Sequence, residues 1–488
     1  MDPSDEMKIE LVKKRAVRGV AALTGRHFIL YGVSFLAQGL LGAFLNPEEW
    51  GVFALVSAVV NFLVYFSDVG LAASLIQKRE KVTEEDLKTT FTVQQFLVIT
   101  LLAILFLTSP LIKSTYELSP VALQLLYALG FSFFLSSLKT IPSVLLERKI
   151  KFEKLALASI AENLAYNIVL VYFAWQGYGI SSFSYAVLFR GVIGLVFLYT
   201  LEPWMPGFAF SRKSLRNLLT FGIPYQVNTL VAVVKDDGII IVLGRLLGLE
   251  SMGILIWAQK WAQMPLRLFM DHVTKVTFPA FSRMQNEKEH LSRSVTRSIF
   301  FICFLVFPAI AGLLVTAPIL IQIVPRYEKW APALLPLSLI SINVVFAAVT
   351  TQLTNLLNAT GRIRTTFKLM LMWASLTWLI VPYAAMKYGV AGAAGGYALV
   401  GASSVIAIIV VKKVVNFSLW EGAGKPGLSA LVMGMVLLFA RNTLDPSLLS
   451  FVILVVIGII AYGFVIFALA RGALINDVKK FTSSLFSK

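Results

Sequence analysis

The stretch GAFLNPEEWG (residues 42–51) has a second copy, GRLLGLESMG, at residues 244–253. Three positions match at a constant spacing of 202 residues: Gly42 and Gly244, Glu48 and Glu250, Gly51 and Gly253. Both copies lie in a short polar turn between two long apolar segments. We interpret the pair as a trace of internal duplication, with the chance recurrence of turn glycines as the alternative.

Apolar residues dominate the chain around this repeat. Of 488 residues, 58% are hydrophobic and 14% are charged, which lies far outside the range of soluble globular proteins. The sequence therefore predicts a multi-span membrane protein. Its net charge of +17 is expected to face lipid headgroups, so no nucleic acid partner is predicted. One cysteine and three histidines exclude an internal disulfide and predict no metal site.

Segments long enough to cross a bilayer number fourteen. A spanning helix needs about 20 mostly apolar residues, and this criterion predicts spans at 20–45, 51–77, 88–109, 121–146, 155–176, 182–202, 217–246, 251–281, 298–324, 333–357, 366–386, 390–412, 428–441 and 448–471. The predicted fold class is an all-α integral membrane protein with about 14 transmembrane helices. Two six-helix halves are related by pseudo-two-fold symmetry, and two C-terminal helices follow.

The predicted spans divide the chain into domains. A basic N-terminal tail at 1–19 precedes the first six-helix bundle at 20–202, and a linker at 203–216 leads to the second bundle at 217–413. Two additional helices at 428–471 and a tail at 472–488 complete the chain. The start is polar and basic, so no cleaved signal peptide is expected.

Lysine and arginine alternate between the loops. The loops on one side, with the two tails, hold about 30 of these residues and the opposite loops about 6. The basic loops include 78–88, 147–154 and 283–297, and the opposite loops include 46–50 and 326–332. We therefore expect a cell (inner or plasma) membrane protein with both termini in the cytoplasm.

Two blocks of sequence carry a family resemblance. EEWGVFALVSAVVNFLVYFSDVGLAASLIQKRE (48–80) and IIIVLGRLLGLESMGILIWAQKW (239–261) resemble the polysaccharide-exporter branch of the multidrug/oligosaccharidyl-lipid/polysaccharide superfamily, most of all its Wzx-type flippases. The resemblance implies transport of a polyprenyl-diphosphate-linked oligosaccharide to the outer leaflet by alternating access, for a surface polymer such as lipopolysaccharide. It further implies membrane lipids as partners, together with the polymerase and glycosyltransferases of the same pathway.

Cations within the predicted spans are candidates for binding the diphosphate. Charged residues inside a bilayer usually face a cavity or a partner, and guanidinium groups pair well with phosphate oxygens. The candidates for substrate binding are Arg26, Arg190, Lys235, Lys260 and Arg267, with Trp261 as a platform for a sugar ring. Surface anchoring is the alternative for Arg26, and a structural ion pair is the alternative for Lys235.

Acids within the predicted spans are candidates for ion coupling. Asp68, Glu162, Asp236 and Asp237 are the positions expected to take up Na⁺ or H⁺. No Walker pattern G-x-x-x-x-G-K-[ST] is present, so no nucleotide cofactor is expected. The sequence GIP at 222–224 predicts a kink or break in the seventh span.

Two other functions remain open on sequence alone. A multidrug or metabolite antiporter of the same superfamily would call for an acidic cavity when its substrate is cationic. A membrane-embedded glycan polymerase or ligase would need a large outer loop or a catalytic cluster beyond the membrane. Basic residues outnumber acids, and the outer loops are short, so the sequence favours a transporter rather than an enzyme.

Overall fold

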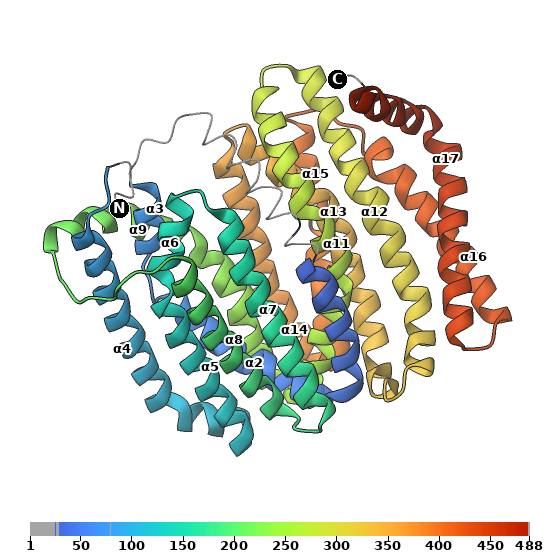
Figure 1. The fold of residues 1–488 in the computed structure, drawn as a ribbon. Helices are drawn as coiled ribbons and strands as arrows, with labels where there is room; N and C mark the ends of the chain where they lie inside the picture. The colour runs from blue at the N-terminus through green and yellow to red at the C-terminus, as the bar shows by residue number, and fades with distance from the viewer. Residues whose placement is uncertain (1–24, 26–28, 79, 487–488) are drawn as a thin grey trace. The chain divides into compact units, whose positions relative to one another are not determined.

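The computed structural model describes residues 25, 29–78 and 80–486 (Figure 1). Those residues form helices and turns with no strand among them. The predicted all-α membrane fold is therefore confirmed. Arg26, a predicted substrate residue, lies outside the described residues.

Two compact units make up the chain, Met1–Gly253 and Ile254–Lys488. The first unit contains the helix Ile29–Phe44, α2 (Pro47–Val64), α3 (Leu71–Gln77), α4 (Glu84–Tyr116), α5 (Pro120–Leu138), α6 (Thr140–Arg148), α7 (Phe152–Trp175), α8 (Ile180–Leu201), α9 (Arg212–Val233), the π-helix η1 (Val234–Gly238) and α10 (Ile239–Leu247). Within it, α8 packs along α7 and α5, α9 packs on α3, and both η1 and α10 pack on α2.

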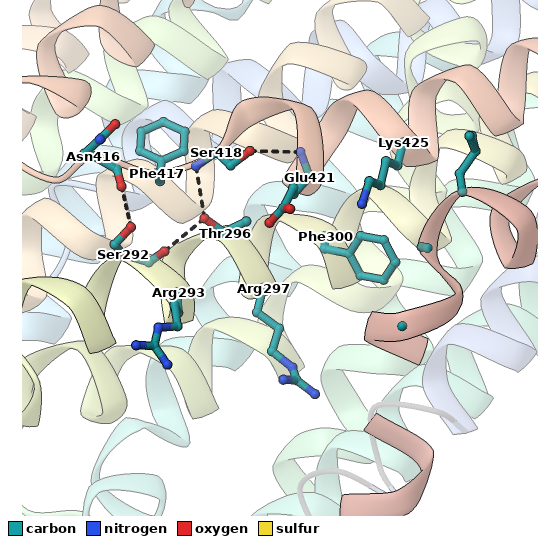
Figure 2. Close-up of a pocket in the computed structure, with 13 residues that line it drawn as sticks. Ser292, Arg293, Thr296, Arg297, Phe300, Asn416, Phe417, Ser418, Glu421 and Lys425 are labelled. Carbon is teal, nitrogen blue, oxygen red and sulfur yellow. Dashed lines mark hydrogen bonds between the residues drawn. The ribbon is translucent and has the colours of Figure 1, made fainter. Parts of the chain in front are cut away.

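The second unit takes up most of α11 (Leu249–Arg283) and the helices that follow it. These are α12 (Lys288–Ile323), the 3₁₀ helix η2 (Glu328–Ala333), α13 (Leu334–Ala359), α14 (Ile363–Ala402), α15 (Val405–Lys412), the π-helix η3 (Trp420–Gly424), α16 (Lys425–Thr443) and α17 (Leu448–Phe486). After α15, the chain returns to α12, where Ser292 Oγ donates a hydrogen bond to the carbonyl of Asn416 (Figure 2).

Ten helical segments among the described residues are long and apolar enough to span a membrane. The spans predicted at 366–386 and 390–412 merge into one of these segments, although Tyr388 and Gly389 depart from helical geometry between them. The span predicted at 51–77 is divided between α2 and α3. These mergers and breaks are compatible with about fourteen spans, and the number itself stays a prediction.

Backbone contact between the two copies of the repeated turn organises the first unit. A Cβ placed on Gly51 would lie 1.7 Å from the carbonyl oxygen of Leu249, and one on Gly253 would lie 1.7 Å from that of Pro47. Pro47 and Leu249 begin α2 and α11 and are themselves 202 residues apart. The contacts are thus exchanged reciprocally, as a local two-fold axis requires.

A second close approach explains a difference from the sequence-based prediction. The expected break at 222–224 is wrong, because α9 is helical from Arg212 to Val233. Gly222 instead packs against the gap between α2 and α3, where Gly70 has a φ of 75° and a Cβ would lie 2.4 Å from the carbonyl oxygen of Gly222. Glycine at 222 therefore allows α9 to pack closely on the segment between α2 and α3. The irregular segment of the predicted seventh span is η1.

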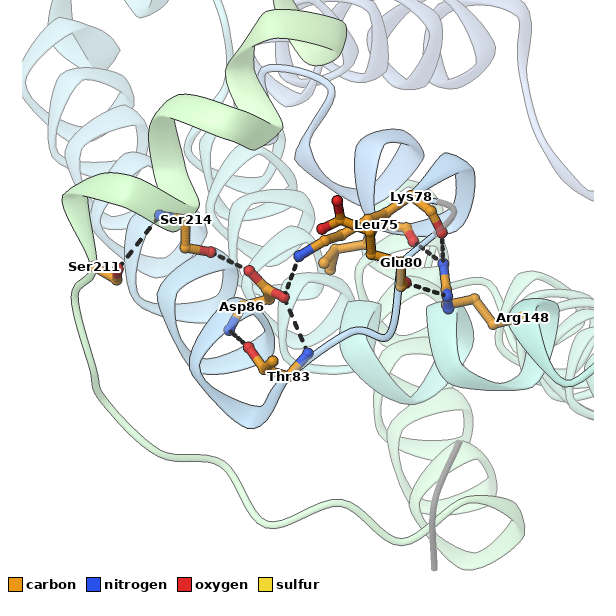
Figure 3. Close-up of polar contacts among 8 residues, drawn as sticks. All are labelled: Leu75, Lys78, Glu80, Thr83, Asp86, Arg148, Ser211 and Ser214. Atoms are coloured by element: carbon orange, nitrogen blue, oxygen red, sulfur yellow. Dashed lines mark hydrogen bonds and ion pairs between the residues drawn. The ribbon is translucent and has the colours of Figure 1, made fainter. Parts of the chain in front are cut away.

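Three of the basic loops meet at one end of the first unit (Figure 3). Lys78 Nζ lies 2.7 Å from one carboxylate oxygen of Asp86, and the hydroxyl of Ser214 donates to the other. Arg148 donates to the carbonyl oxygens of Leu75 and Lys78 at the end of α3, the latter at 2.9 Å. Loops predicted to share one side of the membrane are thus joined directly.

Two contacts involve the turns that were predicted to lie on the opposite side. A Cβ on Gly179, which precedes α8, would lie 2.3 Å from a carboxylate oxygen of Glu49 in α2. The hydroxyl of Tyr116, at the end of α4, donates to the carbonyl of Ile241 at 3.2 Å. The first of these contacts joins two turns that were predicted to share one side, and the side of the membrane that each turn occupies stays a prediction.

The contact between the repeated turns predicts a strong effect of a single methyl group. We expect Gly51→Ala and Gly253→Ala each to destabilise the protein by about 1–3 kcal/mol or more, since the added Cβ overlaps a backbone carbonyl that cannot rotate away. Thermal unfolding in detergent measures the effect. Gly395→Ala is the matched control, because its Cβ would have nothing within 4 Å. A Gly51→Ala protein as stable as this control would contradict the contact.

Candidate functional site

Three charged side chains cluster inside the first unit. Glu162 lies on α7, Lys139 lies between α5 and α6, and Arg190 lies on α8. Lys139 Nζ is 2.5 Å from Glu162 Oε1, and Arg190 Nε is 3.8 Å from Glu162 Oε2. Gly194 on α8 makes room for the carboxylate, since a Cβ there would lie 2.4 Å from Glu162 Oε1. We call Lys139, Glu162 and Arg190 the carboxylate triad.

Burial differs sharply within the carboxylate triad. The side chains of Glu162 and Lys139 are 13% and 16% exposed, whereas that of Arg190 is 56% exposed. Arg190 also lies 5.9 Å from the ring centre of Tyr166, within range of a cation–π contact. Lys139 therefore neutralises most of the buried charge on Glu162, and Arg190 presents its remaining guanidinium donors outward.

A cavity of about 330 Å³ opens beside the triad. Glu162 and Lys139 line it together with hydroxyl groups from α6 and α7, at Thr140, Ser143 and Ser159. The structure thus brings together two residues that the sequence singled out separately, Glu162 and Arg190. It adds Lys139, which sequence reasoning missed although a lysine within the span predicted at 121–146 was a visible signal.

The acids of the seventh span lie in η1 and point to different partners. Lys235 Nζ lies 2.5 Å from Asp236 Oδ1, and Asp237 lies near the side chain of Asn61 on α2. Single π-helical turns within α-helices are frequent at functional sites. Lys235 therefore has an ion pair with its neighbour in sequence, Asp236 remains 67% exposed, and the role of Lys235 stays a prediction.

Asp68, the remaining candidate for ion coupling, has a structural contact. Its carboxylate oxygens accept the N–H of Ala72 at 3.0 and 3.3 Å, in the first turn of α3. This satisfies a helix-start donor that has no partner within the helix. The described geometry of Asp68 is thus that of a residue that stabilises the start of α3.

The cations of the eighth span lie on α11 in the second unit. Lys260 and Arg267 are exposed, and Arg267 donates to Gln263 Oε1 at 2.7 Å. Seven residues is close to two helical turns, so both cations lie on one face of the helix. Trp261 has its ring centre 5.8 Å from that of Trp257, which in turn stacks on Trp330 at 4.9 Å. Trp261 is thus the partly buried edge of an aromatic cluster.

Comparison with known proteins gives a consistent result. A family model described as "Polysaccharide biosynthesis protein" matches residues 40–335, more than half of the chain. The succinoglycan biosynthesis transport protein ExoT of Rhizobium meliloti is 26% identical over 58% of this chain and 57% of its own length. The lipopolysaccharide biosynthesis protein WzxC of Escherichia coli is 24% identical over 75% of this chain and 74% of its own length.

Among solved structures, the fold is similar to that of the lipid II flippase MurJ in an inward closed conformation. The TM-score is 0.76 at 16% identity, over 94% of this chain and all of the MurJ chain. At that identity the similarity concerns the fold. The aligned region covers little more than half of the ExoT protein.

The carboxylate triad predicts non-additive effects of substitution. We expect Glu162→Gln to destabilise the protein by about 1–3 kcal/mol, because it leaves Lys139 without a charged partner in a poorly solvated site. The double variant Lys139→Gln/Glu162→Gln should lose less than the sum of the two single changes. Thermal unfolding in detergent provides the measurement, with Glu328→Gln on an exposed residue as control. Strict additivity of the two changes would contradict the pairing.

Proposed function

We propose that this chain, which belongs to the family of polysaccharide biosynthesis proteins, moves a polyprenyl-diphosphate-linked oligosaccharide from the cytoplasmic to the outer leaflet by alternating access. The proposal depends above all on one observation, the exposure of Lys260 and Arg267 within a 35-residue helix. The names of the relatives ExoT and WzxC support the class of substrate.

The position of these two cations along α11 is informative. Lys260 is eleven residues from the start of α11 at Leu249. Eleven residues of α-helix extend about 16 Å along the axis, which is about half the thickness of the hydrocarbon core. A lysine or arginine facing lipid at that depth costs about 3 kcal/mol on insertion scales. Exposed cations there are therefore expected to border a space that admits water and a polar ligand.

A lipid-linked diphosphate matches this arrangement chemically. Its phosphates carry negative charge that must be compensated when they leave water, and Arg267 can provide two parallel N–H donors to one phosphate. Lys260 supplies a second charge about 10 Å further along the same face. In the first unit, Arg190 offers a further exposed guanidinium. Glycosyltransferases on the cytoplasmic side would supply such a substrate, and a polymerase outside would consume it.

Export should therefore depend on the exposed cations of α11. We expect Arg267→Ala and Lys260→Ala each to reduce surface polysaccharide at least about tenfold in cells lacking the wild-type gene, since each removes one phosphate-binding charge. Arg267→Lys should restore part of the export, because lysine cannot make the paired contact. Lipid-linked glycan accumulated in the inner leaflet is measured alongside protein abundance.

Arg283→Ala is the matched control for this experiment, because it removes an exposed arginine from the last turn of the same helix. It should leave export unchanged. Export at the wild-type level by both Arg267→Ala and Lys260→Ala would rule out this part of the mechanism.

Ion coupling is assigned in this proposal to η1. Asp236 exchanges Lys235 for Na⁺ or H⁺ as the protein changes state, so that ion occupancy biases which side opens. The exposed carboxylate of Asp236 and its ion pair with the adjacent Lys235 support this choice. Asp237 keeps its contact with Asn61 and has a structural role.

The two aspartates should consequently respond differently. Asp236→Asn is expected to abolish the dependence of transport on an ion gradient in proteoliposomes. A neutral amide cannot form an ion pair with Lys235 and then take up Na⁺ or H⁺ in its place. Asp237→Asn should have a mild effect, since an amide oxygen still accepts a hydrogen bond from Asn61. The reverse order of effects, or no effect of either change, would refute the assignment to Asp236.

Orientation completes the proposal for this multi-span membrane protein. Both termini and the basic loops face the cytoplasm, as the distribution of lysine and arginine indicates. Single cysteines at 84 and 288 in a Cys303→Ser background should resist an impermeant thiol reagent in intact cells, whereas cysteines at 48 and 328 should react. Labelling at 84 or 288 in intact cells would contradict the proposed topology.

A further inference from the structure

A second cavity, of about 550 Å³, lies within the second unit, and its lining includes none of the residues proposed for transport. Its walls come from the start of α12, from the segment 416–425 and from α17 at residues 469–472. A volume of this size falls in the range of small-ligand sites. Figure 2 shows the labelled residues around it. We call this space the C-terminal pocket.

Hydrogen bonds hold the wall of the C-terminal pocket in place. The N–H of Ser418 donates to Thr296 Oγ1 at 3.2 Å, and the N–H of Glu421 donates to Ser418 Oγ at 3.2 Å. Gly422 packs closely on α12, where a Cβ would lie 3.0 Å from a methyl carbon of Ile299. The segment 416–425 is therefore fixed against α12, and the pocket has a defined wall.

Positive charge dominates the pocket. Arg293 and Arg297 are one turn apart on α12 and extend to the same side, and Lys425 lies across from them at the start of α16 (Figure 2). Glu421 is the acidic residue of the lining, so the lining holds three cations and one carboxylate. Arg293 pairs with Glu289, but these side chains are 66% and 79% exposed. Such an exposed pair is weak enough to exchange for a phosphate.

Apolar surface adjoins the charges of the pocket. Phe300 and Leu469 contribute to the lining, and α17 leaves helical geometry at Ala470, at the edge of the pocket. Trp420 beside the pocket and Phe467 on α17 are 58% and 49% exposed. Exposed tryptophan next to basic residues is typical of the headgroup region of a bilayer.

We propose that the C-terminal pocket binds the phosphodiester headgroup of an anionic membrane phospholipid, with the acyl chains running along the apolar surfaces of α16 and α17. Arg293, Arg297 and Lys425 contact the phosphate oxygens. The carboxylate of Glu421 repels the phosphate and so limits the affinity for the lipid. A soluble phosphate compound would use the same cations but would gain nothing from the apolar surface. The proposal is independent of the transported substrate.

Titration of the purified full-length protein in neutral detergent tests this site. Phosphatidylglycerol should raise the unfolding temperature, and phosphatidylcholine should not. The variant Arg293→Gln/Arg297→Gln/Lys425→Gln should need about tenfold more phosphatidylglycerol or more for the same shift, since each lost cation near an anionic headgroup weakens binding. The matched control is Arg362→Gln/Arg364→Gln/Lys368→Gln, which removes three exposed cations near the start of α14 and should respond like the wild type.

Two further arms separate the sources of phosphate and guard against misfolding. Inorganic phosphate and glycerol phosphate should give no comparable shift, and an effect equal to that of the lipid would overturn the assignment to a phospholipid. Glu421→Gln keeps all three cations and should tighten lipid binding, which a misfolded protein could not do. Equal weakening of the pocket variant and the matched control, or no tightening by Glu421→Gln, would overturn the site.

Discussion

Two backbone segments touch where glycine leaves no side chain between them, and much of the first unit depends on that contact. Gly51 meets the carbonyl of Leu249, and Gly253 meets that of Pro47. With the starts of α2 and α11 held together, α10 packs along α2, where a Cβ on Gly244 would lie 2.8 Å from Leu55. The same packing places η1 against α2. Van der Waals contact at this distance is sensitive to a single methyl group.

Charged side chains within the predicted spans have two kinds of surroundings in this fold. Lys139 and Lys235 each lie 2.5 Å from a carboxylate, so their charges are largely compensated within the first unit. Lys260 and Arg267 on α11 have exposed side chains, and Arg267 also donates to Gln263. In a medium of low dielectric constant a charge needs a partner or water. This difference directs the functional proposal to α11 and leaves the internal pairs as elements that can exchange partners between states.

The C-terminal pair of helices stands apart from the part of the chain that defines the family. The family model ends at residue 335, whereas α16 and α17 begin at Lys425 and Leu448. Both helices pack on α12, and the chain that leads to them is held to α12 by hydrogen bonds. The basic pocket lies at this junction, with one wall from α12 inside the family region and the other from the chain that follows α15.

The sequence by itself determined the all-α membrane fold and the repeated turn at 42–51 and 244–253. These features are local, because each span must satisfy its own backbone hydrogen bonds in lipid and its hydropathy is read along the chain. Tertiary structure alone decided that Lys139 pairs with Glu162, that Asp68 binds the start of α3, and that Gly222 packs on Gly70 without breaking α9. Those outcomes depend on which helices become neighbours. A hydropathy pattern carries no information on that choice, because an apolar helix face can pack equally well against lipid tails or against another helix.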